Sequence, residues 1–305
     1  MTEPIDPGDR PPQPARRRSS AVVIIVVLVA LAAGLIAWWR WPAPVQPRAG
    51  ADSPPGAPAE TPPEQADASP SAGQAPGAPQ HPVDVPDAAA LPADAAGQLE
   101  DALAGLVGRQ AMTSLLRVDD LVRRVVATVD NLPRAHAPSQ AWPVAPTAGR
   151  FRVERGKDGT MTVPPDNAGR YEAFVSLAES VDAARAAALY ARFYPLFQRA
   201  YAELGYPGRH FNDRLVEVID HLLQAPEPAQ PLQVTLVEVR TEGGEAGKAF
   251  ARPWVRYEFA DPKLEALSAG QKLMIRVGPD NARRLKARLK ELRQHVAGGA
   301  LAARR

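Results

Sequence analysis

The longest apolar run in the sequence lies near its amino end, from Ser19 to Trp39, where 21 consecutive residues carry no charge. About 20 apolar residues in a helix match the roughly 30 Å hydrocarbon core of a bilayer. We therefore predict a transmembrane helix over residues 19–40, since backbone amides inside lipid must be satisfied locally. A cleaved signal peptide is the alternative, because Ala30-Leu31-Ala32 resembles a cleavage site, but the apolar run continues past it.

Arginines set the expected orientation of this helix. Arg16, Arg17 and Arg18 precede the apolar run, whereas only Arg40 and Arg48 follow it closely. Loops rich in positive charge stay on the cytoplasmic side of a membrane. The bias towards Ala, Arg and Pro is typical of a GC-rich bacterial genome. We therefore expect a single pass through a bacterial inner membrane, with a cytoplasmic amino end and a periplasmic carboxyl-terminal domain.

Proline and alanine dominate the next stretch, residues 41–96, which contains no aromatic residue after Trp41. Such a segment buries too little apolar surface to offset the entropy of ordering its backbone, so we predict a disordered linker. His81 falls within this linker and is assigned no role. The polar residues 1–18 are expected to form a disordered cytoplasmic tail, and residues 299–305 a second disordered tail.

Apolar residues return in regular patterns between residues 97 and 298, which we predict to be one globular α+β domain. Apolar positions three and four apart are typical of helices, and alternating ones of strands. The expected helices lie near residues 99–107, 121–131, 167–175, 183–204, 210–224 and 281–296. The expected strands are 151–154, 160–163, 232–239, 254–259 and 272–277. We expect several helices packed on a mainly antiparallel sheet.

Charge and composition narrow the possible chemistry. The 36 basic and 34 acidic residues give a net charge of +2, so no global field favours nucleic acid as a partner. The absence of cysteine excludes thiol nucleophiles, cysteine zinc sites and disulfide bonds. The motifs GxSxG, SxxK and HExxH, typical of serine and zinc hydrolases, do not occur. We assign no catalytic residue, no cofactor and no metal.

A row of aromatic residues lies along the predicted helix 183–204. Tyr190, Tyr194, Phe197 and Tyr201 follow at steps of four, three and four residues, so they share one face. Flat aromatic faces suit the stacking of sugar rings, which makes Tyr190 and Tyr194 candidate ligand-binding residues. The alternative is a stripe buried in the core, which is the commoner use of aromatic side chains.

A row of possible metal ligands lies on the next predicted helix. His210, Asp213, Glu217 and His221 follow at steps of three, four and four, and all are residue types that bind metals. They gather opposite the apolar stripe of the helix, where solvated charge is usual. Because metal-binding histidines need an enclosed site with oriented partners, we favour a solvated face over a metal site.

The last predicted helix is strongly basic. Six cations lie on it against the single acid Glu291. Arg283, Arg284 and Lys286 are therefore candidate ligand-binding residues for an anionic envelope polymer, a lipid headgroup or an acidic face of a membrane protein. The alternative is a solvated basic helix, which is the commoner case.

One short sequence occurs twice, each time before a predicted helix. Pro-Asp-Asn-Ala-x-Arg ends at Arg170 and again at Arg284. Asp166 and Asp280 are expected to cap the two helices by accepting amide hydrogen bonds. A duplicated binding corner is the functional interpretation, and repeated turn chemistry is the one that we prefer.

Four stretches of the domain resemble one bacterial family. They are Ala127 to Pro133, Trp142 to Pro146, Tyr257 to Pro262 and Leu267 to Asn281. In these stretches the chain is similar to the family called domain of unknown function 3014, over most of residues 97–298. The resemblance implies an envelope protein with a single membrane anchor. It implies no activity, cofactor or catalytic residue.

Two functions stay open at this point. The first, which we favour, is a non-catalytic module that is held at the inner membrane and binds an envelope polymer or a protein partner. The second is a periplasmic hydrolase that acts on a cell-wall or other polymer, with carboxylates such as Glu258 and Asp261 as acid and base. Carboxylates three residues apart are common, so the pair is weak support.

Overall fold

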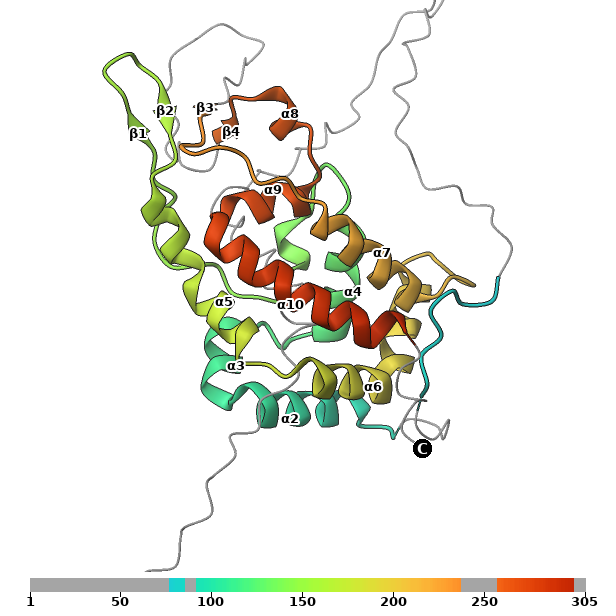
Figure 1. Cartoon of the computed structure of the whole chain (residues 1–305). Coiled ribbons are helices and arrows are strands. Elements are labelled where there is room, and N and C mark those ends of the chain that lie inside the picture. Colours follow the sequence, from blue (N-terminus) through green and yellow to red (C-terminus); the bar gives the residue numbers. More distant parts are fainter. Residues whose placement is uncertain (1–76, 86–91, 237–256, 299–305) are drawn as a thin grey trace, which may run out of the picture.

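Helices dominate the folded part of the chain. The computed structural model describes residues 77–85, 92–236 and 257–298 (Figure 1). Its α-helices are α2 (Ala95–Val107), α3 (Arg109–Leu115), α4 (Leu121–Asn131), α5 (Glu172–Glu179), α6 (Ala183–Glu203), α7 (Phe211–Leu223), α8 (Pro262–Glu265), α9 (Ala269–Arg276) and α10 (Pro279–Ala297). Two 3-10 helices are η1 (Ser139–Ala141) and η2 (Pro165–Tyr171).

The segments expected at the two ends of the chain cannot be compared with this fold. The tail 1–18, the transmembrane helix 19–40, most of the linker and the tail 299–305 lie outside the described residues. Within the described part, no helix combines the length and apolar content that crossing a membrane requires.

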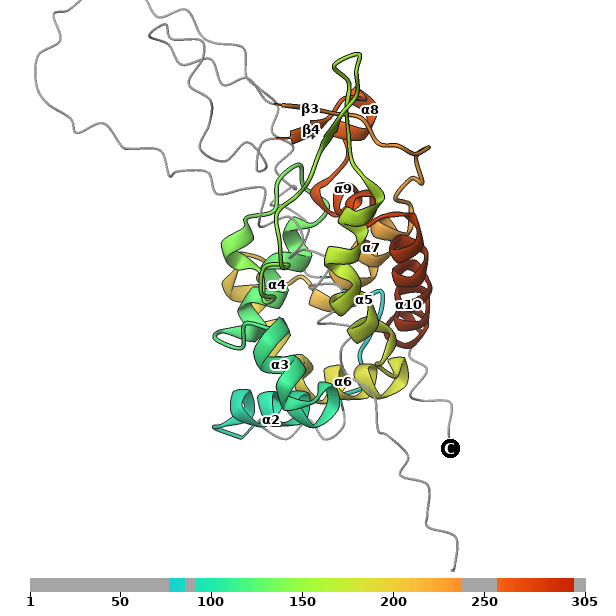
Figure 2. The same cartoon turned by 90° about the vertical axis from the view of Figure 1, so that its left-hand side faces the viewer.

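Helix α10 packs against three other helices because apolar side chains recur along one of its faces. Leu285, Leu289, Leu292 and Val296 are buried, and the helix contacts α5, α6 and α7. Helix α4 packs against α6 and α7, and α2 packs against α3 and α6. Figures 1 and 2 place α2 and α6 at one end of the domain and the strands at the other. The helices therefore share one apolar core.

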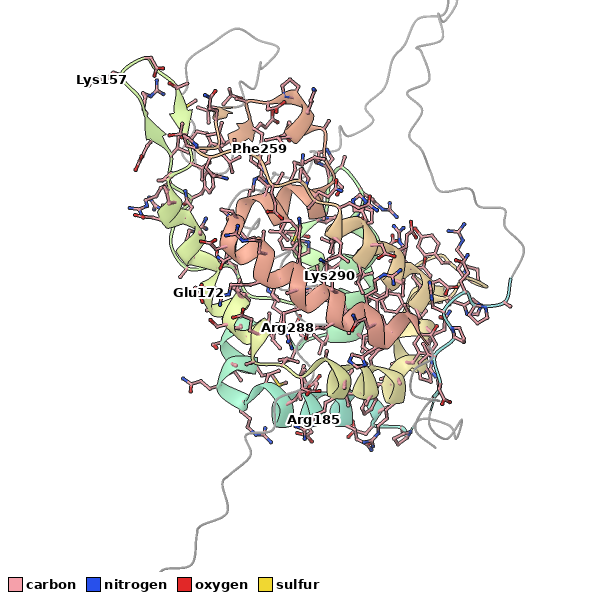
Figure 3. The ribbon with its side chains drawn as sticks, in the orientation of Figure 1. Lys157, Glu172, Arg185, Phe259, Arg288 and Lys290 are labelled. Atoms are coloured by element: carbon pink, nitrogen blue, oxygen red, sulfur yellow. The ribbon has the colours of Figure 1, made fainter. Side chains whose placement is uncertain are left out.

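Two short antiparallel hairpins form the β part of the described fold. Strand β1 (Glu154–Arg155) pairs with β2 (Met161–Thr162), and β3 (Val234–Leu236) pairs with β4 (Tyr257–Phe259). Figure 3 shows Lys157 at the tip of the first hairpin. A single bridge between β2 and the residue before β3 links the hairpins. The α+β class is confirmed. The described helices pack mainly on one another rather than on a sheet, because these strands are too short to cover them.

The predicted strand 272–277 is wrong, because residues 272–276 belong to helix α9 and Val277 is its C-cap. Ser268 caps the helix by accepting a hydrogen bond from the amide of Gln271. The alternation of Leu273, Ile275 and Val277 suggested a strand. In the helix, Leu273 and Val277 face the main core, whereas Ile275 faces a second small core beneath the hairpins. Apolar surroundings on two sides of one short helix therefore imitate the pattern of a strand.

The two Pro-Asp-Asn-Ala corners start helices, but their aspartates do not cap them. Asp166 pairs with Arg152 and Asp280 with Arg283, and both lie inside the first turn. The buried asparagines make the structural bonds instead. Asn167 exchanges two hydrogen bonds with the main chain of Arg152.

The second corner packs directly against the first. Asn281 donates to the main-chain oxygens of Ala168 and Val277. Gly278 has φ of 90°, and a Cβ there would lie 2.8 Å from the Cβ of Ala168. The repeat is therefore turn chemistry that joins two corners. The first follows β2, whereas the second follows helix α9 and not the strand predicted there.

Candidate functional site

The first turn of α7 is fixed by contacts with α6. Phe211 is fully buried, and its ring stacks on Phe197 with centroids 6.0 Å apart. Its amide donates to Gln198 Oε1 at 2.9 Å, and Gln198 Nε2 donates to the main-chain oxygen of Arg209 at 2.7 Å. One glutamine thus ties the loop before α7 to α6, and it fixes the direction in which Asn212 and Asp213 project.

Asn212 and Asp213 hold a distant segment of the same chain, residues 77–85. Asp213 accepts hydrogen bonds from two consecutive amides, those of Gln80 at 3.1 Å and His81 at 2.7 Å. Asn212 Nδ2 donates to the main-chain oxygens of His81 at 2.8 Å and of Val296 at 2.9 Å. Asn212 therefore joins the segment, α7 and the end of α10 at one buried point, and Figure 1 shows the segment passing the end of α10.

Two histidines complete the contacts with this segment. His81 Nδ1 lies 2.9 Å from the main-chain oxygen of Ala297, and His210 Nε2 lies 3.1 Å from that of Gly77. A carbonyl oxygen only accepts hydrogen bonds, so Nδ1 of His81 and Nε2 of His210 are the donors in these two contacts. Val83 packs against the main apolar core. We call the surface formed by His210, Asn212, Asp213 and the end of α10 the α7–α10 groove.

The structure differs here from the predicted linker 41–96. Residues 77–85 lie in the α7–α10 groove, and His81, which was assigned no role, makes three hydrogen bonds in it. The segment has few apolar side chains of its own, so its composition predicted disorder. Polar partners more than 130 residues away along the chain satisfy its main-chain groups instead.

A cavity of about 540 Å³ lies beside the amino end of the docked segment. Its walls include Gly77 and Ala78 of the segment, Gly208 and the side chains of Tyr201, Arg209, His210, Arg214 and Glu217. Burial raises the pKa of Tyr201 to about 12, and the nearby Asp130 carboxylate adds to this rise. Tyr201 is therefore protonated at neutral pH and is not a general base.

Arg214 is held in the wall of the cavity by two carboxylates. Its Nε lies 3.2 Å from Asp130 Oδ1, and its Nη1 lies 3.0 Å from Glu217 Oε1. Its Nη2 also donates to the main-chain oxygen of Asp130 at 2.9 Å. Arg134 and Tyr206 both contact the other oxygen of Asp130. This network therefore holds several charged groups in fixed positions around the cavity.

The family of the chain follows from a comparison with known protein families. A family model described as "Protein of unknown function (DUF3014)" matches residues 121–293. The chain belongs to the DUF3014 family. The match includes α4 to α7 and most of α10, and therefore the α7 side of the groove, whereas the docked segment lies before it. The searches of curated proteins and of solved structures found no match.

The possible metal ligands of this DUF3014 domain have separate partners. His210 and Asp213 contact the docked segment, Glu217 pairs with Arg214, and His221 Nε2 lies 2.7 Å from Ser268 Oγ. Burial and the charge of Arg214 lower the pKa of His221. Among the described residues, no group of three or more His, Asp or Glu is placed to hold a metal ion. The row is also not simply solvated, because two of its members line the α7–α10 groove.

The aromatic row of α6 lies mostly inside the DUF3014 domain. Tyr190 is 3% exposed, Phe197 4% and Tyr201 2%. Tyr194 is partly buried, and its hydroxyl donates to Gln198 Oε1 at 2.8 Å. The ring of Tyr190 meets those of Tyr194 and Phe197 edge-on. The row is therefore a core stripe, and Tyr190 presents no face to a sugar ring in this conformation.

The three candidate cations of α10 are already paired within the chain. Arg283 pairs with Asp280, and Lys286 Nζ lies 2.9 Å from Glu227 Oε1. Arg284 makes bidentate contacts with both Glu172 and Glu179 of α5, which raise its pKa. Lys290 lies on the outward face of the same helix (Figure 3). An anionic partner of Arg284 or Lys286 would have to displace carboxylates that join α10 to other segments.

The carboxylates suggested for a hydrolase are not arranged as an acid and base pair. Asp261 Oδ1 accepts from the amide of Lys263 at 2.9 Å and thereby caps α8. Glu258 lies in the middle of β4, half-buried. Because one member caps a helix, the structure adds no support for hydrolysis at this pair.

Proposed function

We propose that this DUF3014 protein is a membrane-anchored, non-catalytic module that binds an extended segment of a partner protein in the α7–α10 groove. The single observation behind this proposal is that Asp213 and Asn212 bind main-chain groups of residues 80 and 81. Main-chain amides and carbonyls are common to all polypeptides. A groove that recognises them therefore accepts other sequences of the same backbone shape.

The docked segment is the model for such a ligand. Its three main-chain bonds to Asp213 and Asn212 give affinity, and Val83 adds one apolar contact. A segment tethered to its own domain binds at a high effective concentration, so weak contacts are enough to hold it. A partner must then either offer better side-chain contacts or meet the groove when the resident segment is released.

The proposed anchor places this groove in the periplasm. The uncharged run 19–39 and the preceding arginines support a single pass through a bacterial inner membrane, with the amino end cytoplasmic. We expect a reporter enzyme that works only after export to be active when fused at the carboxyl end. Activity restricted to a reporter that works in the cytosol would contradict this orientation.

The binding proposal is tested with a full-length chain in which residues 77–83 are replaced by a Gly/Ser sequence of equal length. We expect a peptide of residues 77–85 to bind this vacant-groove chain one to one in calorimetric titration. Asp213→Ala removes the acceptor of two hydrogen bonds. Bonds to a charged group contribute about 1.5–3 kcal/mol each, so affinity should fall more than tenfold.

Asp220→Ala is the matched control, because Asp220 lies on the same helix but pairs with Arg293. It should leave the peptide affinity unchanged. Equal losses in the two variants, or no binding to a folded vacant-groove chain, would contradict the proposal.

A further inference from the structure

The docked segment lines the cavity beside it with two small residues and Gln80, and it leaves the space unfilled. Gly77 and Ala78 both line the cavity. A Cβ built on Gly77 would meet no atom within 4 Å. There is therefore open space where a side chain at this position would begin.

We propose that the cavity is a side-chain pocket for an aromatic residue of the partner segment, at the position that Gly77 occupies in the resident one. This inference rests on the proposed function of the α7–α10 groove. At about 540 Å³ the cavity has the size of a ligand pocket and exceeds one aromatic side chain. It lies next to His210, which binds the main-chain oxygen of Gly77 and so fixes where the side chain begins.

The chemistry of the walls favours an aromatic side chain over a charged one. Arg209 and Arg214 are balanced by Asp213 and Glu217, so the walls carry no net charge that would attract an ion. Tyr201 is 2% exposed and its ring stacks on that of Tyr206, so an aromatic ligand would meet the arginines of the wall instead. The guanidinium groups of Arg209 and Arg214 offer cation–π contact with an aromatic ring that enters the cavity. A neutral ring can lie against these guanidinium groups, whereas a carboxylate would compete with Asp213 and Glu217 for the same cations.

The first experiment compares three peptides of residues 77–85 that carry Gly, Phe or Glu at position 77. Each is titrated into the vacant-groove full-length chain in detergent micelles. We expect the Phe peptide to bind about tenfold more tightly than the Gly peptide, since the open cavity buries part of an aromatic ring. Equal affinities would overturn the side-chain pocket and leave the groove proposal standing. Tightest binding of the Glu peptide would overturn the aromatic class, and binding of none would overturn the groove itself.

The second experiment needs no vacant groove and uses Gly77→Phe in the otherwise native full-length chain. A ring that fills the cavity should increase the fraction of molecules in which the resident segment is docked. We expect hydrogen exchange of the His81 amide, which donates to Asp213, to slow about tenfold. Unchanged or faster exchange in a folded chain would overturn the pocket. This result can be read even if the chain with residues 77–83 replaced does not fold, because Gly77→Phe keeps the segment.

Discussion

Replacing Asp130 by asparagine should lower the free energy of unfolding by about 3 kcal/mol. The side chain of Asp130 is 4% exposed and lies against Arg134 and Arg214. Removing one partner of a buried ion pair typically costs about 3–5 kcal/mol, because the remaining charge is left without compensation. We expect the lower end, since the Arg134 side chain is 45% exposed and water solvates it in part. Denaturant unfolding of the full-length chain measures the difference.

Asp119→Asn is the matched control for this variant. Asp119 also pairs with an arginine, Arg124, but its side chain is 71% exposed, so we expect little change in stability. Asp130 also fixes Arg214 in the wall of the cavity, and Asp130→Asn should therefore weaken any preference for an aromatic peptide. Similar losses of stability for the two variants would show that burial does not set the strength of the Asp130 contacts.

Long periodic stretches allowed the helical part of the fold to be predicted from the sequence. The predicted helices 183–204, 210–224 and 281–296 correspond to α6, α7 and α10 within a few residues. In α10, leucines at positions 285, 289 and 292 mark one face strongly enough to fix both the helix and its buried side. The first hairpin could be predicted from a turn signal instead, because Asp158-Gly159 separates two short β-rich runs.

What the sequence did not reveal depends on contacts between distant residues. Residues 272–277 are predicted as a strand because Ile275 is apolar on the side of the helix away from the main core. The hairpins cover Ile275, and the sequence does not show that contact. The docked segment is the clearer case. Its local composition resembles that of the linker before it, and contacts with distant residues such as Asn212 and Asp213 distinguish it. The sequence places Asp213 in a row of possible metal ligands, and nothing in it indicates that the main chain of residues 80 and 81 is its partner.

Phe211→Ala should have the largest effect of the variants considered, about 4 kcal/mol. Phe211 is fully buried, and its ring meets those of Phe197, Tyr190 and Tyr201 at centroid distances of 6.0, 6.4 and 5.6 Å. Truncating a buried phenylalanine to alanine costs about 3–5 kcal/mol through lost transfer free energy and the cavity that remains. Denaturant unfolding of the full-length chain measures this loss.

The same variant tests whether core packing positions the α7–α10 groove. Phe211 precedes Asn212 and Asp213, and its side chain joins the first turn of α7 to α6, so a cavity beneath that turn should also weaken peptide binding in the vacant-groove chain. Phe211→Leu keeps most of the volume and should lose less than half as much stability, with nearly normal binding. If Phe211→Ala remained folded and bound the peptide normally, the aromatic core would not be what positions the groove. The hydrogen bond from the amide of residue 211 to Gln198 would then be enough to position Asn212 and Asp213.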